Sequence, residues 1–163
     1  LPGVGAFGDC MDHLHNHGYV EPLQSWIAAD RPLLGICLGL QVLAESSEES
    51  PGGAGFGVVA SPVVKFEPDV ELKVPQIGWN RVKQVAGRDC PLFRGIPDGS
   101  YFYFVHSFYL ARAGEWAAGL TEYGREYVSA VWRGRVAAVQ FHPEKSQQAG
   151  LRLLQNYIEW SQE

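Results

Sequence analysis

An apolar run over residues 32–36 leads directly into a cysteine, Cys37, that has glycine two positions away on each side, at Gly35 and Gly39. Continuous apolar runs of this length are typical of strands buried on both faces of a sheet. A strand that turns sharply into a helix needs small residues at the turn, because bulkier side chains would collide there. The pattern therefore predicts an α/β fold in which Cys37 is lifted above a sheet edge.

Cys37 is accordingly a candidate nucleophile. A thiol at the start of a helix lies at the positive end of the backbone dipole, which favours the thiolate that attacks carbonyl carbon. Taken alone, a buried cysteine between glycines is more often a structural core residue than a catalytic one. Gln41 and Glu45 follow at four-residue intervals, which predicts that the three side chains lie along one stripe of a helix.

A base for this thiol is offered by His142, which follows a strand-like run over residues 135–141. Such a histidine is expected to emerge at the end of a sheet, and Glu144, two residues further on, can hold its imidazole from the same side. A lone histidine after a strand is often only a polar cap, so the conjunction with the cysteine carries the inference. We predict a catalytic triad of Cys37, His142 and Glu144.

Two further segments bear on the same site. Residues 2–5 (PGVG) expose successive backbone N–H groups, which together with the N–H of Leu38 would suit an oxyanion, although glycine-rich loops are mostly ordinary turns. His106, in a predicted strand over residues 101–110, is the competing base. Because it lacks a carboxylate close in sequence, it is expected to serve packing or substrate binding.

The remaining pattern predicts helices at about 9–19, 22–29 and 149–160, and strands at 127–132 and 135–141 joined by a tight turn. Prolines divide residues 58–85 into short strand-like pieces. Helices alternate with buried strands early in the chain, and hairpins come late. This order predicts an α/β sandwich with a largely parallel sheet.

Composition excludes several classes of function. The net charge of -5 over 163 residues leaves no basic surface for nucleic acid or for anionic lipid. No apolar stretch approaches the ~20 residues that cross a bilayer. Three cysteines are too few and too widely spaced for a disulfide framework, which indicates a reducing, cytoplasmic setting. The length suits one domain.

Three residues near the start of the sequence form a possible metal site. Cys10, His13 and His17 are three and four residues apart, so on a helix they share a face and could in principle hold zinc. Three ligands on one short helix with no fourth make a poor site. We therefore predict no metal, and a small zinc-binding module is a competing interpretation.

Five segments resemble, in order, sequence blocks of the class I (triad-type) glutamine amidotransferases, and within that family those of the glutaminase subunit of imidazole glycerol phosphate synthase. They are residues 1–8 (LPGVGAFG), 35–41 (GICLGLQ), 75–80 (PQIGWN), 103–107 (YFVHS) and 142–146 (HPEKS). Many amidotransferases share the cysteine block and the His-Pro-Glu triplet, whereas PGVGAFG, GWN and HPEKS point to histidine biosynthesis.

The resemblance implies a class I glutamine amidotransferase-like (flavodoxin-like) three-layer sandwich, with a mostly parallel central sheet and antiparallel additions. It also implies hydrolysis of glutamine to glutamate and ammonia through a thioester on Cys37, with His142 as base and then acid and Glu144 orienting it. No cofactor is implied. The ammonia would pass to a cyclase subunit with a (β/α)8 barrel, of the HisF type, for synthesis of imidazole glycerol phosphate and AICAR.

Further roles are carried over by the same resemblance. They are an oxyanion hole from Val4, Gly5 and Leu38, glutamine binding by Gly3, Gln41, His106, Ser107 and Phe108, and a partner interface that includes Trp79, Asn80 and Lys145. The sequence departs from the usual family pattern at Gln76, where histidine is usual, at Leu40, where methionine is common, and at Phe108, where tyrosine is usual.

The family also carries a strand, a helix and a second strand ahead of the PGVG block. The resemblance therefore leads us to expect that residues 1–163 form a single, N-terminally truncated domain with an unpaired sheet edge. Two other interpretations stay open beside the leading one. The chain could be an amidotransferase of another pathway, such as the pyridoxal phosphate or anthranilate type, or a non-catalytic fragment that binds a partner.

Overall fold

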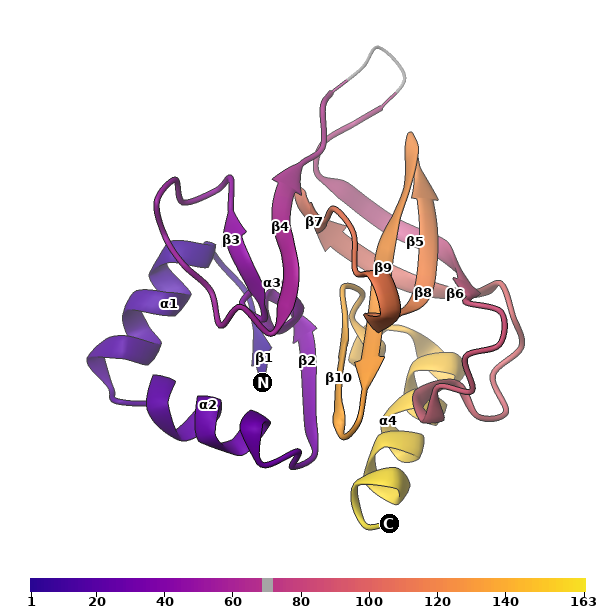
Figure 1. The fold of residues 1–163 in the computed structure, drawn as a ribbon. Coiled ribbons are helices and arrows are strands. Elements are labelled where there is room, and N and C mark those ends of the chain that lie inside the picture. Colours follow the sequence, from indigo (N-terminus) through magenta and orange to yellow (C-terminus); the bar gives the residue numbers. More distant parts are fainter. Residues whose placement is uncertain (69–71) are drawn as a thin grey trace.

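The computed structural model describes residues 1–68 and 72–163, within which ten strands form one curled sheet (Figure 1). The strands are β1 (Pro2–Gly3), β2 (Leu33–Cys37), β3 (Ala44–Ser47), β4 (Val59–Lys65), β5 (Gln76–Gln84), β6 (Ser100–His106), β7 (Phe108–Leu110), β8 (Ala117–Tyr123), β9 (Arg125–Arg133) and β10 (Val136–Val139). The helices are α1 (Phe7–Asn16), α2 (Val20–Ala28), α3 (Leu38–Gln41) and α4 (Gln147–Ser161), with short 3-10 turns η1 (Pro91–Phe93), η2 (Gly114–Trp116) and η3 (Pro143–Lys145). None of the helices in the described ranges is long and apolar enough to cross a membrane.

Parallel pairing is found where the candidate functional residues lie. β1 and β10 both pair in parallel with β2, with Gly3 beside Cys37 and Val139 beside Ile36. Because the carboxyl ends of neighbouring parallel strands meet at one edge of a sheet, the segments that follow β1, β2 and β10 emerge together. This edge is where ligands bind in open α/β sheets.

The predicted α/β class is confirmed, but the sheet is mixed rather than mostly parallel. Among the described strands, β1–β2, β2–β10 and β3–β4 pair in parallel, and the other pairs are antiparallel. Tight turns at Gly124 and Gly134, both with positive φ, join β8 to β9 and β9 to β10. Such short connections permit only antiparallel neighbours, since a parallel pair needs a long crossover.

Helices cover both faces of β2. Leu33 packs in a cluster that includes Leu23 and Ile27 of α2. The next residue, Leu34, belongs to a second cluster that includes Leu153 of α4. Because successive strand residues point to opposite faces, α2 and α4 lie on opposite sides of the sheet. The arrangement is a three-layer sandwich, as expected.

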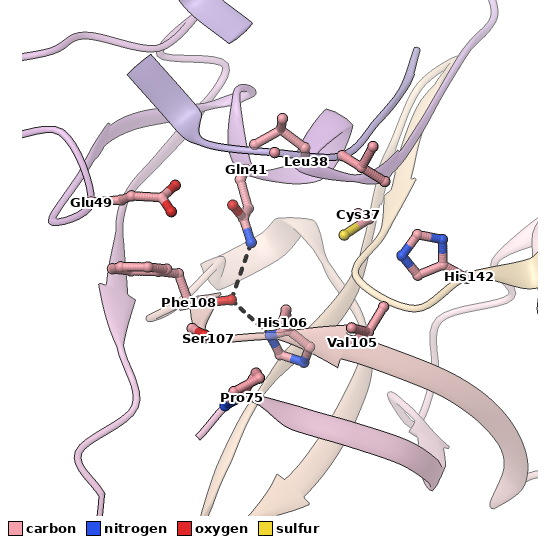
Figure 2. A pocket seen from close by; sticks show the side chains of 12 residues that line it. Cys37, Leu38, Gln41, Glu49, Pro75, Val105, His106, Ser107, Phe108 and His142 are labelled. Atoms are coloured by element: carbon pink, nitrogen blue, oxygen red, sulfur yellow. Dashed lines mark hydrogen bonds between the residues drawn. The ribbon is translucent and has the colours of Figure 1, made fainter. Parts of the chain in front are cut away.

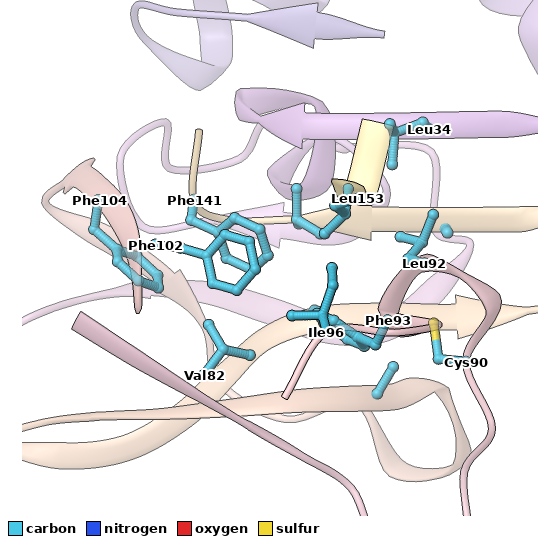
Figure 3. Close-up of a cluster of buried hydrophobic side chains, with 14 of the residues drawn as sticks. Leu34, Val82, Cys90, Leu92, Phe93, Ile96, Phe102, Phe104, Phe141 and Leu153 are labelled. Atoms are coloured by element: carbon cyan, nitrogen blue, oxygen red, sulfur yellow. The ribbon is translucent and has the colours of Figure 1, made fainter. Parts of the chain in front are cut away.

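The cluster on the α4 side also anchors the segment after β10. The ring of Phe141 is fully buried, and its centroid lies 4.2 Å from that of Phe102 and 5.6 Å from that of Phe104, both on β6 (Figure 3). Burial of one such aromatic side chain contributes about 1.5–3 kcal/mol to stability. Phe141 therefore holds the backbone of its two neighbours, Gln140 and His142, in place.

Two differences from the predicted elements affect the site. The helix after Cys37 is a single turn that ends at Gln41, because the chain then enters β3 and pairs with β4. Glu45 is consequently an exposed strand residue and does not continue the predicted stripe. The predicted strand over residues 101–110 is also divided at Ser107 into β6 and β7.

Candidate active site

Cys37 occupies the predicted sharp turn between a strand and a helix. It is the last residue of β2 and caps α3 with φ 54° and ψ -107°, a backbone conformation that residues other than glycine rarely adopt. A Cβ added at Gly39 would collide with the carbonyl oxygen of Leu1, and one at Gly35 would lie 2.7 Å from the carbonyl oxygen of Gly39. The two glycines thus permit the close packing that this strained turn requires.

Replacing Gly39 by alanine is expected to destabilise the fold by about 3 kcal/mol, because the new methyl group meets backbone that cannot swing aside. Gly18→Ala is the matched control. Gly18 has φ +68° with nothing within 4 Å of an added Cβ, so only the backbone strain of about 1–2 kcal/mol applies. Urea unfolding of both variants measures the difference, and equal stabilities would contradict the close-packing explanation.

Cys37 opens into a pocket of about 330 Å³ at the sheet edge (Figure 2). The pocket is lined by Val4, Gly5, Cys37, Leu38, Gln41, Glu49, Pro75, Val105, His106, Ser107, Phe108 and His142. Six separate stretches of chain supply these residues, and most of the sequence-predicted site residues are among them. The structure therefore brings together side chains that lie more than a hundred positions apart in sequence.

His142 has the hydrogen bonding of a base. Its Nδ1 lies 2.6 Å from Oε1 of Glu144, and because a carboxylate only accepts, Nδ1 carries the proton. Its Nε2 is buried and has no hydrogen-bond partner among the described residues. Figure 2 shows the imidazole beside the sulfur of Cys37. An unprotonated nitrogen next to a thiol can accept the thiol proton.

The thiol is held in its neutral form. Burial raises the pKa of Cys37 to about 11, which outweighs a hydrogen bond from the Leu38 N–H that lowers it, and the Glu144 carboxylate raises it further. The expected gain from the helix dipole is therefore not realised, since a one-turn helix offers little against the desolvation of the thiolate. A reaction at Cys37 must begin by moving its proton to a base.

His106 faces the same pocket but is already engaged. Its Nδ1 lies 2.7 Å from the carbonyl oxygen of Phe108, and its Nε2 lies 3.2 Å from the hydroxyl of Tyr127. Burial lowers the pKa of His106 to about 4, so the ring is neutral near pH 7. Gln41 donates to the same Phe108 carbonyl at 3.1 Å. These contacts tie the wall formed by the β6–β7 junction to the helix that carries Gln41.

Two polar residues at the site were missed in the sequence. Glu49, in the loop after β3, lines the pocket, and its Oε2 accepts a hydrogen bond from the Phe7 N–H at 2.7 Å. Its surroundings in sequence, rich in serine and glutamate, indicate only a loop. Gln140 is fully buried, with Nε2 3.7 Å from Sγ of Cys37. A polar residue interrupting the apolar run over residues 136–141 was the available signal.

The positions that depart from the usual family pattern are all accommodated. Gln76 is buried and accepts a hydrogen bond from the Tyr127 hydroxyl at 2.9 Å. Leu40 is a core residue with 1% exposure. Phe108 lines the pocket, with Nζ of Lys65 5.9 Å from its ring centroid.

Several predicted residues lie outside the pocket. Gly3 lines a neighbouring apolar pocket instead, together with Glu144. Trp79 is 46% exposed on β5, where its ring packs edge-on to that of Tyr103, and Lys145 lies over the same tyrosine with Nζ 5.9 Å from the ring centroid. Asn80 donates to the carbonyl of Glu122 at 2.8 Å, and since it follows Trp79 in a strand, it points to the opposite face.

The candidate zinc ligands do not converge on one surface, since His13 and the C-cap residue His17 are exposed whereas Cys10 of α1 is half-buried against the core. The rings of His13 and His17 are tilted by 32° with their centroids 4.1 Å apart, and Nδ1 of His17 lies 2.9 Å from the carbonyl oxygen of His13. Within residues 1–68 and 72–163, no three side chains of His, Cys, Asp or Glu are grouped as metal ligands would be.

Known proteins resemble the chain throughout its length. The family described as "Glutamine amidotransferase class-I" matches residues 1–160. "Imidazole glycerol phosphate synthase subunit HisH" of Syntrophotalea carbinolica is 47% identical over 163 residues, which cover 96% of this chain and 78% of that protein. The protein of the same name from Methanocaldococcus jannaschii is 49% identical, with 98% and 78% covered, and that from Thermococcus kodakarensis is 51% identical, with 96% and 80% covered.

Solved structures share the fold. A structure described as that of a glutamine amidotransferase superimposes with a TM-score of 0.71 at 20% identity, covering 99% of this chain and 77% of the other. A glutamine amidotransferase from Thermotoga maritima superimposes with a TM-score of 0.63 at 19% identity, covering 99% and 62%. At these identities the likeness concerns the fold alone.

Proposed function

The chain belongs to the class I glutamine amidotransferases and, among them, to the group named imidazole glycerol phosphate synthase subunit HisH, and we propose that it releases ammonia from glutamine at the Cys37 pocket. The unpartnered Nε2 of His142 beside Cys37 supports this assignment most strongly. In this proposal Cys37 is the nucleophile, His142 is the base, and Glu144 is the carboxylate that orients the imidazole.

In the proposed reaction, the proton of Cys37 moves to Nε2 of His142 while the sulfur attacks the side-chain amide carbon of glutamine. The carbon–nitrogen bond then breaks, and His142 returns the proton to the departing nitrogen, which leaves as ammonia. Water, deprotonated by the same histidine, cleaves the resulting thioester and releases glutamate. Glu144 stabilises the imidazolium that forms in each half of the reaction.

Backbone N–H groups are proposed to hold the oxyanion of the tetrahedral intermediate. The N–H of Leu38 is close enough to the sulfur to lower the pKa of the Cys37 thiol, so it lies within reach of an oxygen on the attacked carbon. Val4 and Gly5 line the same pocket, and Gly5 has φ +106°. Gly3 is proposed to act indirectly, since a Cβ there would lie 3.3 Å from Cβ of Leu38.

The opposite end of the pocket suits the amino-acid part of the substrate. Glu49 offers a carboxylate for the α-ammonium group of glutamine. Both hydrogens of the Gln41 amide nitrogen are used, one on Phe108 and one on Gln140, so Gln41 presents its oxygen to a ligand. The backbone of Ser107 and Phe108 forms the adjoining wall and is proposed to bind the α-carboxylate.

Glu49→Gln is expected to raise the KM for glutamine about tenfold or more and to change kcat little, because it removes a charge that binds the ground state and transition state alike. The amide retains an oxygen that can accept from Phe7. Glu48→Gln is the matched control, since Glu48 is exposed outside the pocket, where it accepts from the Lys65 N–H. Steady-state ammonia release measures both, and an unchanged KM would remove Glu49 from the substrate site.

A partner subunit is proposed to receive the ammonia, as the name of the relatives, a synthase subunit, indicates. We propose a cyclase with a (β/α)8 barrel. Its docking surface would include Trp79 and Lys145 around Tyr103, with exposed Ile77 and Tyr101 nearby on the same ribbon of β5 and β6. Aromatic residues of this kind are enriched at interfaces. Asn80 is proposed to support this strand through its bond to β8.

Direct passage of ammonia between subunits has a physical advantage, since free ammonia protonates in water and then no longer acts as a nucleophile. A cytoplasmic location is also proposed, in keeping with three free thiols. Growth of a histidine auxotroph that lacks its HisH subunit tests the assignment. Rescue is expected, and an amidotransferase of another pathway or a non-catalytic fragment would fail to rescue.

A further inference from the structure

We propose that Gln140 is a positioning residue that links the Cys37 sulfur to the wall of the substrate pocket through one continuous chain of hydrogen bonds. The inference rests on the proposed role of Cys37 as the nucleophile. Gln140 lies between β10 and His142, and neither the predicted triad nor the predicted substrate-binding set includes it.

Gln140 is held rigidly at this position. Its side chain is 0% exposed, and its backbone N–H donates to the carbonyl of Ser129 at 2.9 Å. Phe141, its neighbour, is locked among the aromatic rings of β6. The amide reaches Sγ of Cys37 at 3.7 Å with Nε2, and its Oε1 lies 3.2 Å from Nε2 of Gln41. Both ends of the amide are therefore used.

A backbone carbonyl determines which group donates and which accepts in each of these hydrogen bonds. The carbonyl oxygen of Phe108 can only accept, so the group that Gln41 turns toward it at 3.1 Å must be the amide nitrogen. The second hydrogen of that nitrogen then points to Gln140, whose oxygen must accept it. The nitrogen of Gln140 is consequently the end that faces Cys37, and it presents an N–H to the sulfur.

An N–H donor at the sulfur favours the thiolate that forms when the proton leaves. Burial raises the pKa of Cys37 to about 11, and hydrogen bonds from the Leu38 N–H and the Gln140 side chain lower it. A glutamine at this place donates to sulfur and accepts from Gln41 without adding a charge. A glutamate would lack the N–H and would repel the thiolate. An apolar side chain would neither donate to the sulfur nor accept from Gln41.

The same chain of hydrogen bonds extends to the wall of the substrate pocket. The Phe108 carbonyl accepts from Gln41 and from Nδ1 of His106, so both of its lone pairs are occupied and its peptide cannot rotate freely. Loss of Gln140 would free the Gln41 amide to turn. Gln140 thus couples two requirements of the reaction, a stabilised thiolate and a fixed pocket wall.

Alkylation of Cys37 by iodoacetamide as a function of pH tests the proposal in the unliganded chain. The rate is followed on the peptide that contains Cys37, with the Cys10 and Cys90 peptides as internal references. In Gln140→Met the rate at a fixed pH is expected to fall about 3- to 10-fold and the profile to move to higher pH. Gln155→Met, on the exposed face of α4, is the matched control and is expected to leave the profile unchanged.

The titratable groups around the sulfur stay in place in these variants; they are His106, Glu49, His142, Glu144 and Lys145. If Gln140→Met loses its cooperative thermal transition, Gln140→Glu is used in its place, because it preserves the shape of the side chain. A slower alkylation of Cys37 is again expected. A folded variant with the profile of the unsubstituted chain would overturn the proposal. Because alkylation does not require glutamine turnover, failure of the glutaminase assignment would appear separately, as absent ammonia release from the unsubstituted chain with its partner.

Discussion

Replacing Cys37 by alanine is expected to reduce ammonia release from glutamine by at least about 10³-fold, measured with the cyclase subunit present. Without the sulfur no thioester forms, and His142 has no proton to accept in the first step. The pocket itself should persist, because alanine is smaller than cysteine. The substitution also leaves intact the glycines that shape the turn.

Cys10→Ala is the matched control for this result. Cys10 lies on α1, away from the pocket, and its replacement is expected to leave ammonia release within about twofold of the original rate. Thermal unfolding should show that both variants fold. Substantial ammonia release by folded Cys37→Ala would mean that another group attacks glutamine, and the role given to the strained turn would be wrong.

Glu144→Gln is expected to lower kcat by about 10²- to 10⁴-fold and to leave the KM for glutamine nearly unchanged. The carboxylate accepts the Nδ1 proton of His142 at 2.6 Å, which keeps Nε2 free to take the thiol proton. An amide is neutral and can donate instead, so it stabilises the imidazolium less and permits the wrong tautomer. The defect should appear in the chemical step, because Glu144 does not line the substrate pocket.

Glu159→Gln on α4 is the control for the change of charge. Glu159 is an exposed residue that accepts from Gln155, far along the helix from the pocket, and its replacement should leave kcat unchanged. If Glu144→Gln also kept its kcat, or if its KM rose while kcat held, Glu144 would be a binding residue and not the partner of His142.

The sequence was most informative where local geometry restricts residue type. An apolar run, a cysteine and two flanking glycines predicted the strand, the sharp turn and the position of Cys37, because few backbones tolerate such a turn. The contact between His142 and Glu144 was predictable for a similar reason. His142 follows the end of a strand, and Glu144, two residues further on, can reach the same side. The terminal helix also appears where its amphipathic pattern predicts it.

Features that depend on contacts distant in sequence were not predictable. Glu49 and Gln140 reach the site only because β3 and β10 bring their segments there. Nothing local distinguishes Glu49, and the interrupted apolar run marks Gln140 as unusual without indicating that it contacts Cys37. The helix after Cys37 ends after one turn because β3 pairs with β4, and the local pattern favoured a longer helix. The pKa of Cys37 follows from burial, which composition does not reveal.

The most direct test of the central claim is covalent trapping of the nucleophile with a glutamine-like diazoketone, followed by mass spectrometry of the digested protein. The reagent resembles glutamine, so it is expected to enter the same pocket, where it alkylates the nucleophile. The proposed mechanism predicts one adduct, on the peptide that contains Cys37, formed more slowly when glutamine competes and absent from Cys37→Ala. Labelling at Cys10 or Cys90, or labelling of Cys37 that glutamine does not slow, would contradict it.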